Sequence, residues 1–319
     1  MIVVSPREAG TDDYVRVGDY TQDRADELCT VSSDYTSLVG MTTQHTQQQI
    51  LVLGGTGKTG RRIVARLQGQ GVPVRVGSRS AQQPFDWTDQ ATWAPALRDI
   101  NAVYVSYYPD LAEPGALETV SAFTDLAVAA GVSRLVLLSG RGQDRAQLAE
   151  KHVQSAGVEW TILRSGWFNQ NFSEDYLLGP ILGGEVVLPV GAVPEPFVDA
   201  DDIAEVATAA LTNNGHAGQL YELTGPRLLT FGEAIAEISA VTGRAVNFVQ
   251  VSPEEYADGL AAVGVPAGAI ELLTHLFTTL LDGRNAQVAD GVARALGRPP
   301  RDFTDYATST AATGVWARA

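Results

Sequence analysis

The chain has 319 residues, of which 45% are hydrophobic, so it is long enough to bury a large core in one or two domains. Its formal net charge of −15 argues against nucleic acid and anionic membranes as partners, and no apolar run is long enough to cross a bilayer. A single cysteine, Cys29, excludes an internal disulfide and is typical of a cytoplasmic protein, and the four scattered histidines predict no metal site.

The N-terminal segment, residues 1–47, differs in composition from the rest of the chain. Acidic residues outnumber basic ones there, hydrophobic periodicity is weak, and the segment ends in a polar run. Such a segment offers little apolar surface to bury, so we predict a poorly ordered extension. It contains no basic region followed by an apolar core, and a signal peptide is therefore not expected.

A glycine motif follows the first apolar run. Residues 50–53 predict a buried strand, and glycines recur at Gly54, Gly57 and Gly60 as a helical pattern over 58–70 begins. In this order the glycines provide a tight turn, a close approach to a pyrophosphate and close helix packing. A P-loop is excluded because its first glycine is missing. The predicted dinucleotide-binding residues are Gly54, Thr56, Gly57, Lys58, Thr59 and Gly60.

The residues after the second expected strand, 73–77, indicate which nicotinamide cofactor is bound. NAD-specific proteins usually place an acid at this point, to bind the ribose 2′-hydroxyl. Here Ser78, Arg79 and Ser80 follow the strand, and there is no acid. Since Arg79 offers a charge-assisted contact to a 2′-phosphate and Ser78 a further hydrogen bond, NADP(H) is favoured over NAD(H).

Strand and helix patterns alternate along the middle of the chain. After a very short third strand, Asp86 and Trp87 are expected to flank the adenine of the cofactor, with a place in the core as the equal alternative for Trp87. The next expected elements are helices at 89–97, 114–130 and 144–156 and strands at 102–107, 135–138 and 160–163. This alternation predicts parallel strands with crossover helices, an α/β fold with a doubly wound (Rossmann) sheet.

The C-terminal part is mostly helical. Helices are expected at 201–211, 230–242, 253–262 and 267–281, with short strands near 220–223 and 246–251. We therefore divide the folded part, residues 48–319, into an NAD(P)-binding domain and a smaller substrate lobe formed by about 166–190 and 225–319. Asp199, Asp201 and Asp202 stand at the head of a helix, where they are expected to cap it and to interact with its dipole.

Aromatic residues follow two of the expected strands. Because ligands of doubly wound folds bind outside the carboxyl ends of the strands, these clusters predict a flat slot for a planar small-molecule substrate. The predicted pocket residues are Tyr107, Tyr108, Trp167, Phe168, Asn169 and Phe172. The sequence leaves the oligomeric state open.

Several segments give the chain a resemblance to a known family. They are residues 53–60, 78–80, 85–87, 160–172 and 197–204. With them the chain resembles the NmrA-like branch of atypical short-chain dehydrogenases/reductases, and within it the ergot-alkaloid-type reductases and their actinobacterial relatives. The resemblance implies an NADP(H)-dependent oxidoreductase or, as the alternative, a non-catalytic NADP(H) sensor that regulates a partner protein.

The resemblance also implies where catalytic residues should stand. The usual Tyr-x-x-x-Lys pair would fall at Gly142 and Ala146, which cannot transfer protons, while Ser139 occupies the place of the family's active-site serine. An ordinary ketone needs a positioned acid when it is reduced. We therefore predict an electron-poor, planar hydride acceptor, such as an iminium ion or a quinone, with Tyr108 as the local substitute acid.

Overall fold

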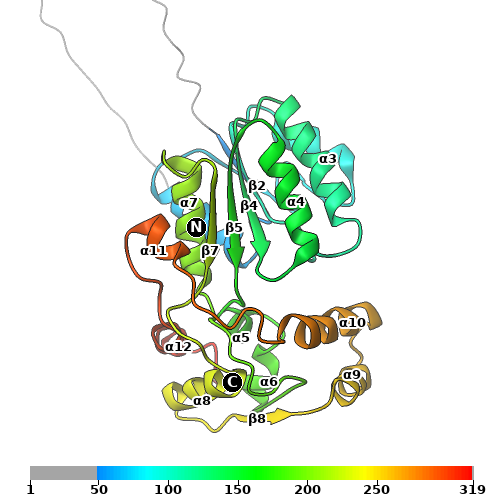
Figure 1. The fold of residues 1–319 in the computed structure, drawn as a ribbon, viewed down its shortest axis with the longest axis vertical. Helices are drawn as coiled ribbons and strands as arrows, with labels where there is room; N and C mark the ends of the chain where they lie inside the picture. The colour runs from blue at the N-terminus through cyan, green and yellow to red at the C-terminus, as the bar shows by residue number, and fades with distance from the viewer. Residues whose placement is uncertain (1–48, 318–319) are drawn as a thin grey trace, which may run out of the picture. The chain divides into compact units, whose positions relative to one another are not determined.

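The computed structural model describes residues 49–317, and its main sheet has six parallel strands in the order β2-β1-β3-β4-β5-β7 (Figure 1). The strands are β1 (Ile50–Leu53), β2 (Val74–Gly77), β3 (Ala102–Val105), β4 (Arg134–Gly140), β5 (Glu159–Ser165) and β7 (Gln219–Leu223). The predicted α/β class and doubly wound sheet are confirmed. The extension predicted over residues 1–47 lies outside the described residues.

Helices cover both faces of this sheet. One face carries α1 (Lys58–Gly69), α7 (Ala200–Thr212) and α11 (Gly291–Leu296), and the other α2 (Trp93–Leu97), α3 (Ala116–Ala129) and α4 (Asp144–Ser155). Side chains alternate along β1, so that Ile50 and Val52 pack in the first layer and Leu51 and Leu53 in the second. A strand that is buried on both faces must be apolar throughout, which explains the uninterrupted apolar run of β1.

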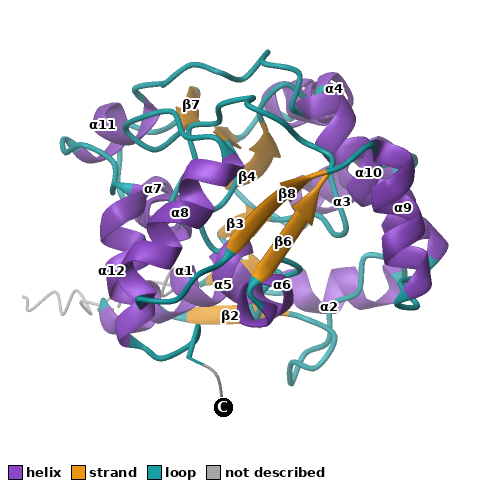
Figure 2. Ribbon diagram, turned by 90° about the horizontal axis from the view of Figure 1, so that it is seen from below, coloured by secondary structure: helices purple, strands orange, loops and turns teal. Residues whose placement is uncertain are grey.

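A smaller lobe lies below the carboxyl ends of the strands in Figure 1. It contains the two-stranded parallel sheet of β6 (Glu185–Leu188) and β8 (Asn247–Gln250), seen side by side in Figure 2. Its helices are α5 (Asn171–Glu174), α6 (Leu178–Gly183), α8 (Phe231–Thr242), α9 (Pro253–Ala262), α10 (Ala267–His275) with the π-helix Leu276–Leu280, and α12 (Phe303–Ala312). No helix within residues 49–317 is long and apolar enough to cross a membrane.

The structure differs from the sequence-based elements at three places. The short strand expected near 220–223, within the mostly helical C-terminal part, is β7, which pairs with β5 and extends the main sheet. Strand β6, the partner of β8, was not expected. In place of the very short third strand there is only an isolated antiparallel bridge between Asp86 and Asp89, followed by the 3-10 turn η1 (Gln90–Thr92) and then α2.

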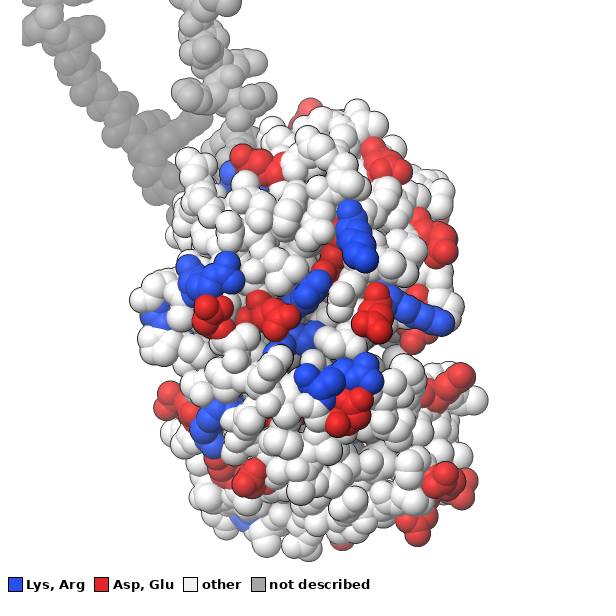
Figure 3. Space-filling model, in the orientation of Figure 1, with Lys and Arg blue, Asp and Glu red and all other residues white. Residues whose placement is uncertain are grey.

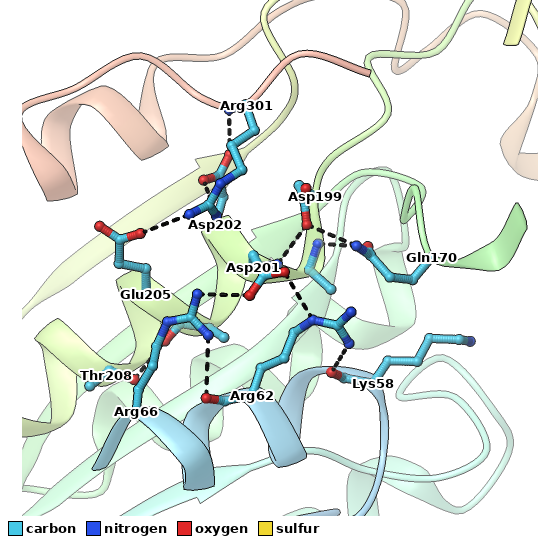
Figure 4. Close-up of polar contacts among 12 residues, drawn as sticks. Lys58, Arg62, Arg66, Gln170, Asp199, Asp201, Asp202, Glu205, Thr208 and Arg301 are labelled. Atoms are coloured by element: carbon cyan, nitrogen blue, oxygen red, sulfur yellow. Dashed lines mark hydrogen bonds and ion pairs between the residues drawn. The ribbon is translucent and has the colours of Figure 1, made fainter. Parts of the chain in front are cut away.

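The acidic head of α7 is tied to α1 (Figure 4). The Asp199 carboxylate accepts a hydrogen bond from the backbone N–H of Asp201 at 2.8 Å and thereby caps α7. Asp201 in turn pairs with Arg62 at 3.2 Å and with Arg66 at 2.7 Å. Asp199 therefore caps α7, as predicted. The ion pairs of Asp201 were not predicted, and they hold α7 and α1 together on one face of the sheet.

Asp202 is fully buried and connects α7 to the chain after α11. Its carboxylate pairs with Arg298 at 2.8 Å and with Arg301 at 3.1 Å, and also accepts the backbone N–H of Arg301 at 2.7 Å. Both arginines also pair with Glu205, one turn further along α7. Figure 3 shows that acidic and basic side chains lie next to one another across the middle of the face in view.

Candidate functional site

A cavity of about 920 Å³ lies at the carboxyl ends of the first five strands. Its lining comes from the ends of β1 (54–59), β2 (77–80), β3 (106–111), β4 (138–143) and β5 (165–168), together with Asn171 and residues from 85–88 and 276–285. Because the strand order is β2-β1-β3-β4-β5, the cavity extends from the loop after β2 to the loop after β5. Among the described residues, 49–317, no group of three His, Cys, Asp or Glu side chains is placed to hold a metal ion.

The glycine loop after β1 forms one wall of this cavity. A Cβ atom added at Gly57 would meet only the Gly54 carbonyl oxygen, at 3.2 Å, within 4 Å. Helix α1 begins at Lys58 with no side chain capping its first turn, so its N-terminal N–H groups are available to an anion. The loop and the helix start therefore fit the pyrophosphate of a dinucleotide.

Gly60 is among the predicted cofactor-binding residues, but in the structure it has the packing role that the glycine spacing also predicted. It does not line the cavity, because it packs against the back of the loop: an added Cβ would lie 2.1 Å from the Gly54 carbonyl oxygen. Thr59 lines the cavity, and its hydroxyl accepts a hydrogen bond from Tyr104 in the sheet at 2.9 Å. Gly60 thus serves loop packing, and the cavity wall is formed by Gly54, Thr56, Gly57, Lys58 and Thr59.

The loop after β2 places Ser78 and Arg79 on the cavity wall. Arg79 is exposed, and its guanidinium makes no hydrogen bond or ion pair within residues 49–317, so it is available to a ligand. Asp86 lines the same end, and hydrogen bonds from Thr88 lower the pKa of its carboxyl. The Trp87 indole N–H donates to the Ser106 carbonyl at 3.1 Å, which fixes its ring beside the cavity.

The aromatic residues at the other end come from two strand ends. Tyr107 and Tyr108 follow β3, and Trp167 and Phe168 follow β5; all four line the cavity. Trp167 stacks on Phe277 at 5.2 Å between ring centroids, so a lobe residue supports its ring. Tyr108 is 75% exposed, which places this phenol at the solvent side of the lining.

Two predicted pocket residues belong to the core instead. Phe172 is fully buried and packs against Phe197 and Phe303, at 5.4 and 5.3 Å between ring centroids. Asn169 is also fully buried, and its side-chain amide has no hydrogen-bond partner within the described part of the chain. Neither side chain lines the cavity: α5, which begins at Asn171, carries Phe172 into the core of the lobe, and Asn169 is buried before that helix starts.

The two positions where the family usually has its tyrosine and lysine are Gly142 and Ala146. Gly142 lies in the loop after β4 with a positive φ of 70°, and Ala146 is fully buried in α4. Ser139, at the end of β4, does line the cavity, and its hydroxyl donates to Glu150 at 2.6 Å. The β4 end of the cavity therefore presents a serine without the proton donor that usually accompanies it.

Comparison with known proteins identifies the family. A family model described as NAD(P)H-binding matches residues 54–214, and the model of the NmrA-like family matches residues 143–307. The chain is 31% identical to the NAD(P)H azoreductase of Xenophilus azovorans over 286 residues, which cover 82% of this chain and 98% of the relative. The chain belongs to the NmrA-like family. Its resemblance to that family, inferred from the sequence motifs, is thereby confirmed.

Two further comparisons concern a dehydrogenase relative and a solved structure with the same fold. It is 31% identical to the festuclavine dehydrogenase of Aspergillus fumigatus over 283 residues, covering 81% of this chain and 96% of the relative. The structure of the Citrobacter sp. triphenylmethane reductase complexed with NADP(H) superimposes with a TM-score of 0.70 at 18% identity, covering 81% of this chain and 99% of that one. At the level of the family, the chain is an NAD(P)H-dependent oxidoreductase, as predicted.

The NmrA-like site contains residues that the sequence analysis did not select, and Arg141 is the most informative of them. It is 4% exposed, lines the cavity after β4, and donates to the carbonyl oxygens of Asn285 and Gln287 at 3.3 and 3.2 Å. It thus fastens the 276–287 segment, which contributes Leu276 to the cavity wall. Its position directly after a strand was a usable signal, whereas Leu276 is one of several leucines in an apolar stretch with nothing to distinguish it.

Glu195 is a second residue that was not expected, although it does not line the cavity. Its side chain is fully buried, and neither carboxyl oxygen has a hydrogen-bond partner within residues 49–317. Burial raises the pKa of this carboxyl to about 7, against the opposing charge of Arg141. Between about pH 4.5 and 7 the folded chain therefore retains a proton that the unfolded chain releases.

This retained proton makes stability depend on pH. As the pH rises from about 4.5 through 7, we expect the free energy of unfolding to fall by up to about 3 kcal/mol on account of Glu195. Glu195→Gln removes the titrating group. The difference in free energy of unfolding between variant and wild type should therefore change by up to about 3 kcal/mol between pH 4.5 and 7. Urea unfolding of both proteins at pH 4.5, 6 and 8 measures it. A difference that stays constant with pH would contradict the assignment.

Arg79 allows a direct test of cofactor preference. We expect Arg79→Ala to weaken NADPH binding about ten- to a hundredfold and to leave NADH binding nearly unchanged, because one charge-assisted contact to the 2′-phosphate is lost. Arg98→Ala is the matched control, since Arg98 is also exposed but does not line the cavity. Calorimetric titration of both cofactors into both variants decides the matter. Equal losses for NADPH and NADH would show that Arg79 does not contact the 2′-phosphate.

Proposed function

We propose that this chain is an NADPH-dependent reductase whose substrate is an electron-poor, planar small molecule such as an iminium ion or a quinone. The observation that carries the proposal is the composition of the cavity. It joins a glycine loop and Arg79 to an aromatic end. Gly142 and Ala146, which do not line the cavity, stand where the family usually has its tyrosine and lysine.

Different residues along the cavity would bind different parts of the cofactor and the substrate. The start of α1 would hold the pyrophosphate, Arg79 the 2′-phosphate, and Asp86 and Trp87 the adenosine end. When bound, the reduced nicotinamide supplies a hydride. Tyr107 and Trp167 would hold a planar substrate between them and exclude water, as aromatic faces bind flat conjugated rings well.

The missing acid determines which substrates suit this site. Reduction of an ordinary ketone leaves an alkoxide, which needs a positioned proton donor. An iminium ion becomes neutral on taking up hydride, and a quinone spreads the charge over its ring, so neither requires that donor. Where a proton is needed, Tyr108 would supply it, because this phenol lines the cavity and is exposed to water.

A substrate panel tests the proposal. Purified protein with NADPH should oxidise the cofactor in the presence of menadione or a cationic triphenylmethane dye, and it should not oxidise 2-propanol with NADP⁺. Absorbance at the NADPH band gives the rates. Rapid alcohol oxidation that survives Tyr107→Phe and Tyr108→Phe would contradict the proposal, and tight NADPH binding without any turnover would favour the regulatory sensor instead.

A further inference from the structure

The hydroxyl of Ser139 has a fixed direction. Ser139 lies at the end of β4, is 4% exposed and lines the cavity next to the β5 loop that carries Trp167. Its Oγ lies 2.6 Å from Oε1 of Glu150, a side chain on α4 that is 1% exposed. Which of the two atoms donates depends on the state of Glu150.

Arg164 holds Glu150 as a carboxylate. The guanidinium Nε lies 2.8 Å from Oε1 and 3.0 Å from Oε2, and Nη2 lies 2.5 Å from Oε2. This is a two-pronged contact between a permanent cation and a carboxyl group. An ionised carboxylate only accepts hydrogen bonds, so the single proton of the Ser139 hydroxyl points to Glu150. The Ser139 oxygen therefore carries only lone pairs on its cavity side, where it can accept a hydrogen bond but cannot donate one.

The charges behind this arrangement balance among themselves. Arg164 also faces Glu222, at 3.7 Å, and Glu222 accepts a hydrogen bond from Arg141 at 3.3 Å, so two arginines are matched by two glutamates. Ser165, the neighbouring serine on the cavity wall, donates its own proton to the Ser139 carbonyl at 3.3 Å. Both serine hydroxyls at this end therefore direct their protons into the protein.

We propose that Glu150 and Arg164 are positioning residues that make Ser139 a hydrogen-bond acceptor towards the substrate, the reverse of an oxyanion-stabilising donor. A serine so oriented favours a hydride acceptor with a positive charge or an N–H group and disfavours a neutral carbonyl, whose oxygen becomes negative during reduction. The proposal rests on the proposed function.

The chemistry balances for a cationic substrate. Hydride forms a new C–H bond at the iminium carbon, and the π pair of the C=N bond moves to nitrogen. The nicotinamide is oxidised, the substrate is reduced to a neutral amine, and no proton is transferred. For a ketone at the same place, the developing oxyanion would face the lone pairs of Ser139, which oppose it.

Glu150→Gln should reverse the direction of the hydrogen bond between Ser139 and residue 150. Arg164 can only donate, so it binds the amide oxygen of the new side chain and turns the amide NH₂ towards Ser139. Ser139 then accepts this bond and its own proton is free to point into the cavity. Ser139→Ala is the companion variant, since it removes the acceptor and leaves the Glu150–Arg164 pair in place.

The test compares kcat/KM for a cationic triphenylmethane dye with kcat/KM for menadione, a neutral quinone. We expect the dye-to-quinone ratio to fall about tenfold or more in both single variants, with unchanged NADPH affinity. In the Ser139→Ala background, Glu150→Gln should change the ratio no further. A ratio that stays at the wild-type value, or an equal effect of Glu150→Gln with and without Ser139, would overturn the proposal.

The experiment separates this proposal from the function on which it rests. If the wild type turns over neither probe, the proposed function fails. The assignment of Ser139 is then decided by absorbance titration of the dye into the NADP⁺-loaded proteins. About tenfold weaker dye binding in Ser139→Ala supports the acceptor role, and equal binding overturns it.

Discussion

Gly57→Val should abolish NADPH binding without unfolding the protein. The added Cβ meets only the Gly54 carbonyl oxygen, at 3.2 Å, and the residue has extended backbone angles that valine adopts readily. The branched side chain would then occupy the space into which the pyrophosphate fits. We expect the affinity for NADPH to fall by at least about 100-fold, equivalent to roughly 3 kcal/mol, in calorimetric titration.

Two other glycines on α1 serve as controls. At Gly69, the last residue of the helix, an added Cβ meets nothing within 4 Å, so Gly69→Val should bind NADPH like the wild type. At Gly60 the added atom would lie 2.1 Å from backbone, so Gly60→Ala should lower the melting temperature as well as the affinity. Wild-type affinity in folded Gly57→Val would show that this loop does not bind the pyrophosphate.

Asp202→Ala should produce the largest loss of stability among the charged residues discussed above. The fully buried carboxylate takes three hydrogen bonds from Arg298 and Arg301, and these join α7 to the segment that leads into α12. Both arginines keep Glu205 as a partner, which limits the penalty. We expect the free energy of unfolding to fall by about 3 kcal/mol in urea titration.

Asp305→Ala provides the matched control for this change. Asp305 is exposed in the first turn of α12, and within residues 49–317 its side chain makes no hydrogen bond or ion pair, so that the helix dipole is its main interaction there. Its removal should cost less than about 1 kcal/mol. If Asp202→Ala were no more destabilising than Asp305→Ala, the ion pairs of Asp202 would make no net contribution to the free energy of folding. The cost of removing these charges from water would then cancel their attraction completely.

The glycine loop was predictable because every requirement for it is local. The apolar strand, the glycine spacing and the helix start stand within about a dozen consecutive residues, and each has its own physical reason. The same holds for Arg79, which is recognised by its position after a strand. Tyr107 and Trp167 were found by the rule that strand ends meet at one edge of a sheet, and both do line the cavity.

The residues that sequence reasoning misplaced depend on contacts across the lobe. Phe172 lies only four residues beyond Phe168, yet α5 turns it into a core completed by Phe303, 131 positions later in the chain. Likewise, nothing in residues 219–223 indicates that they pair with β5 in the main sheet. Such pairings are set by partners distant in sequence, so neither periodicity nor a motif indicates them.

The way in which Arg141 holds the 276–287 segment has a consequence for how this site can diversify. Its guanidinium binds the backbone carbonyls of Asn285 and Gln287, and every amino acid supplies such a carbonyl. These two bonds therefore form whatever side chains stand at positions 285 and 287, and the side-chain amide of Asn285 adds a third bond, to the Arg141 carbonyl at 3.3 Å. Leu276 and Leu280, which shape the cavity wall, are free to vary while the segment stays attached, so substrate choice can change by single substitutions at little structural risk.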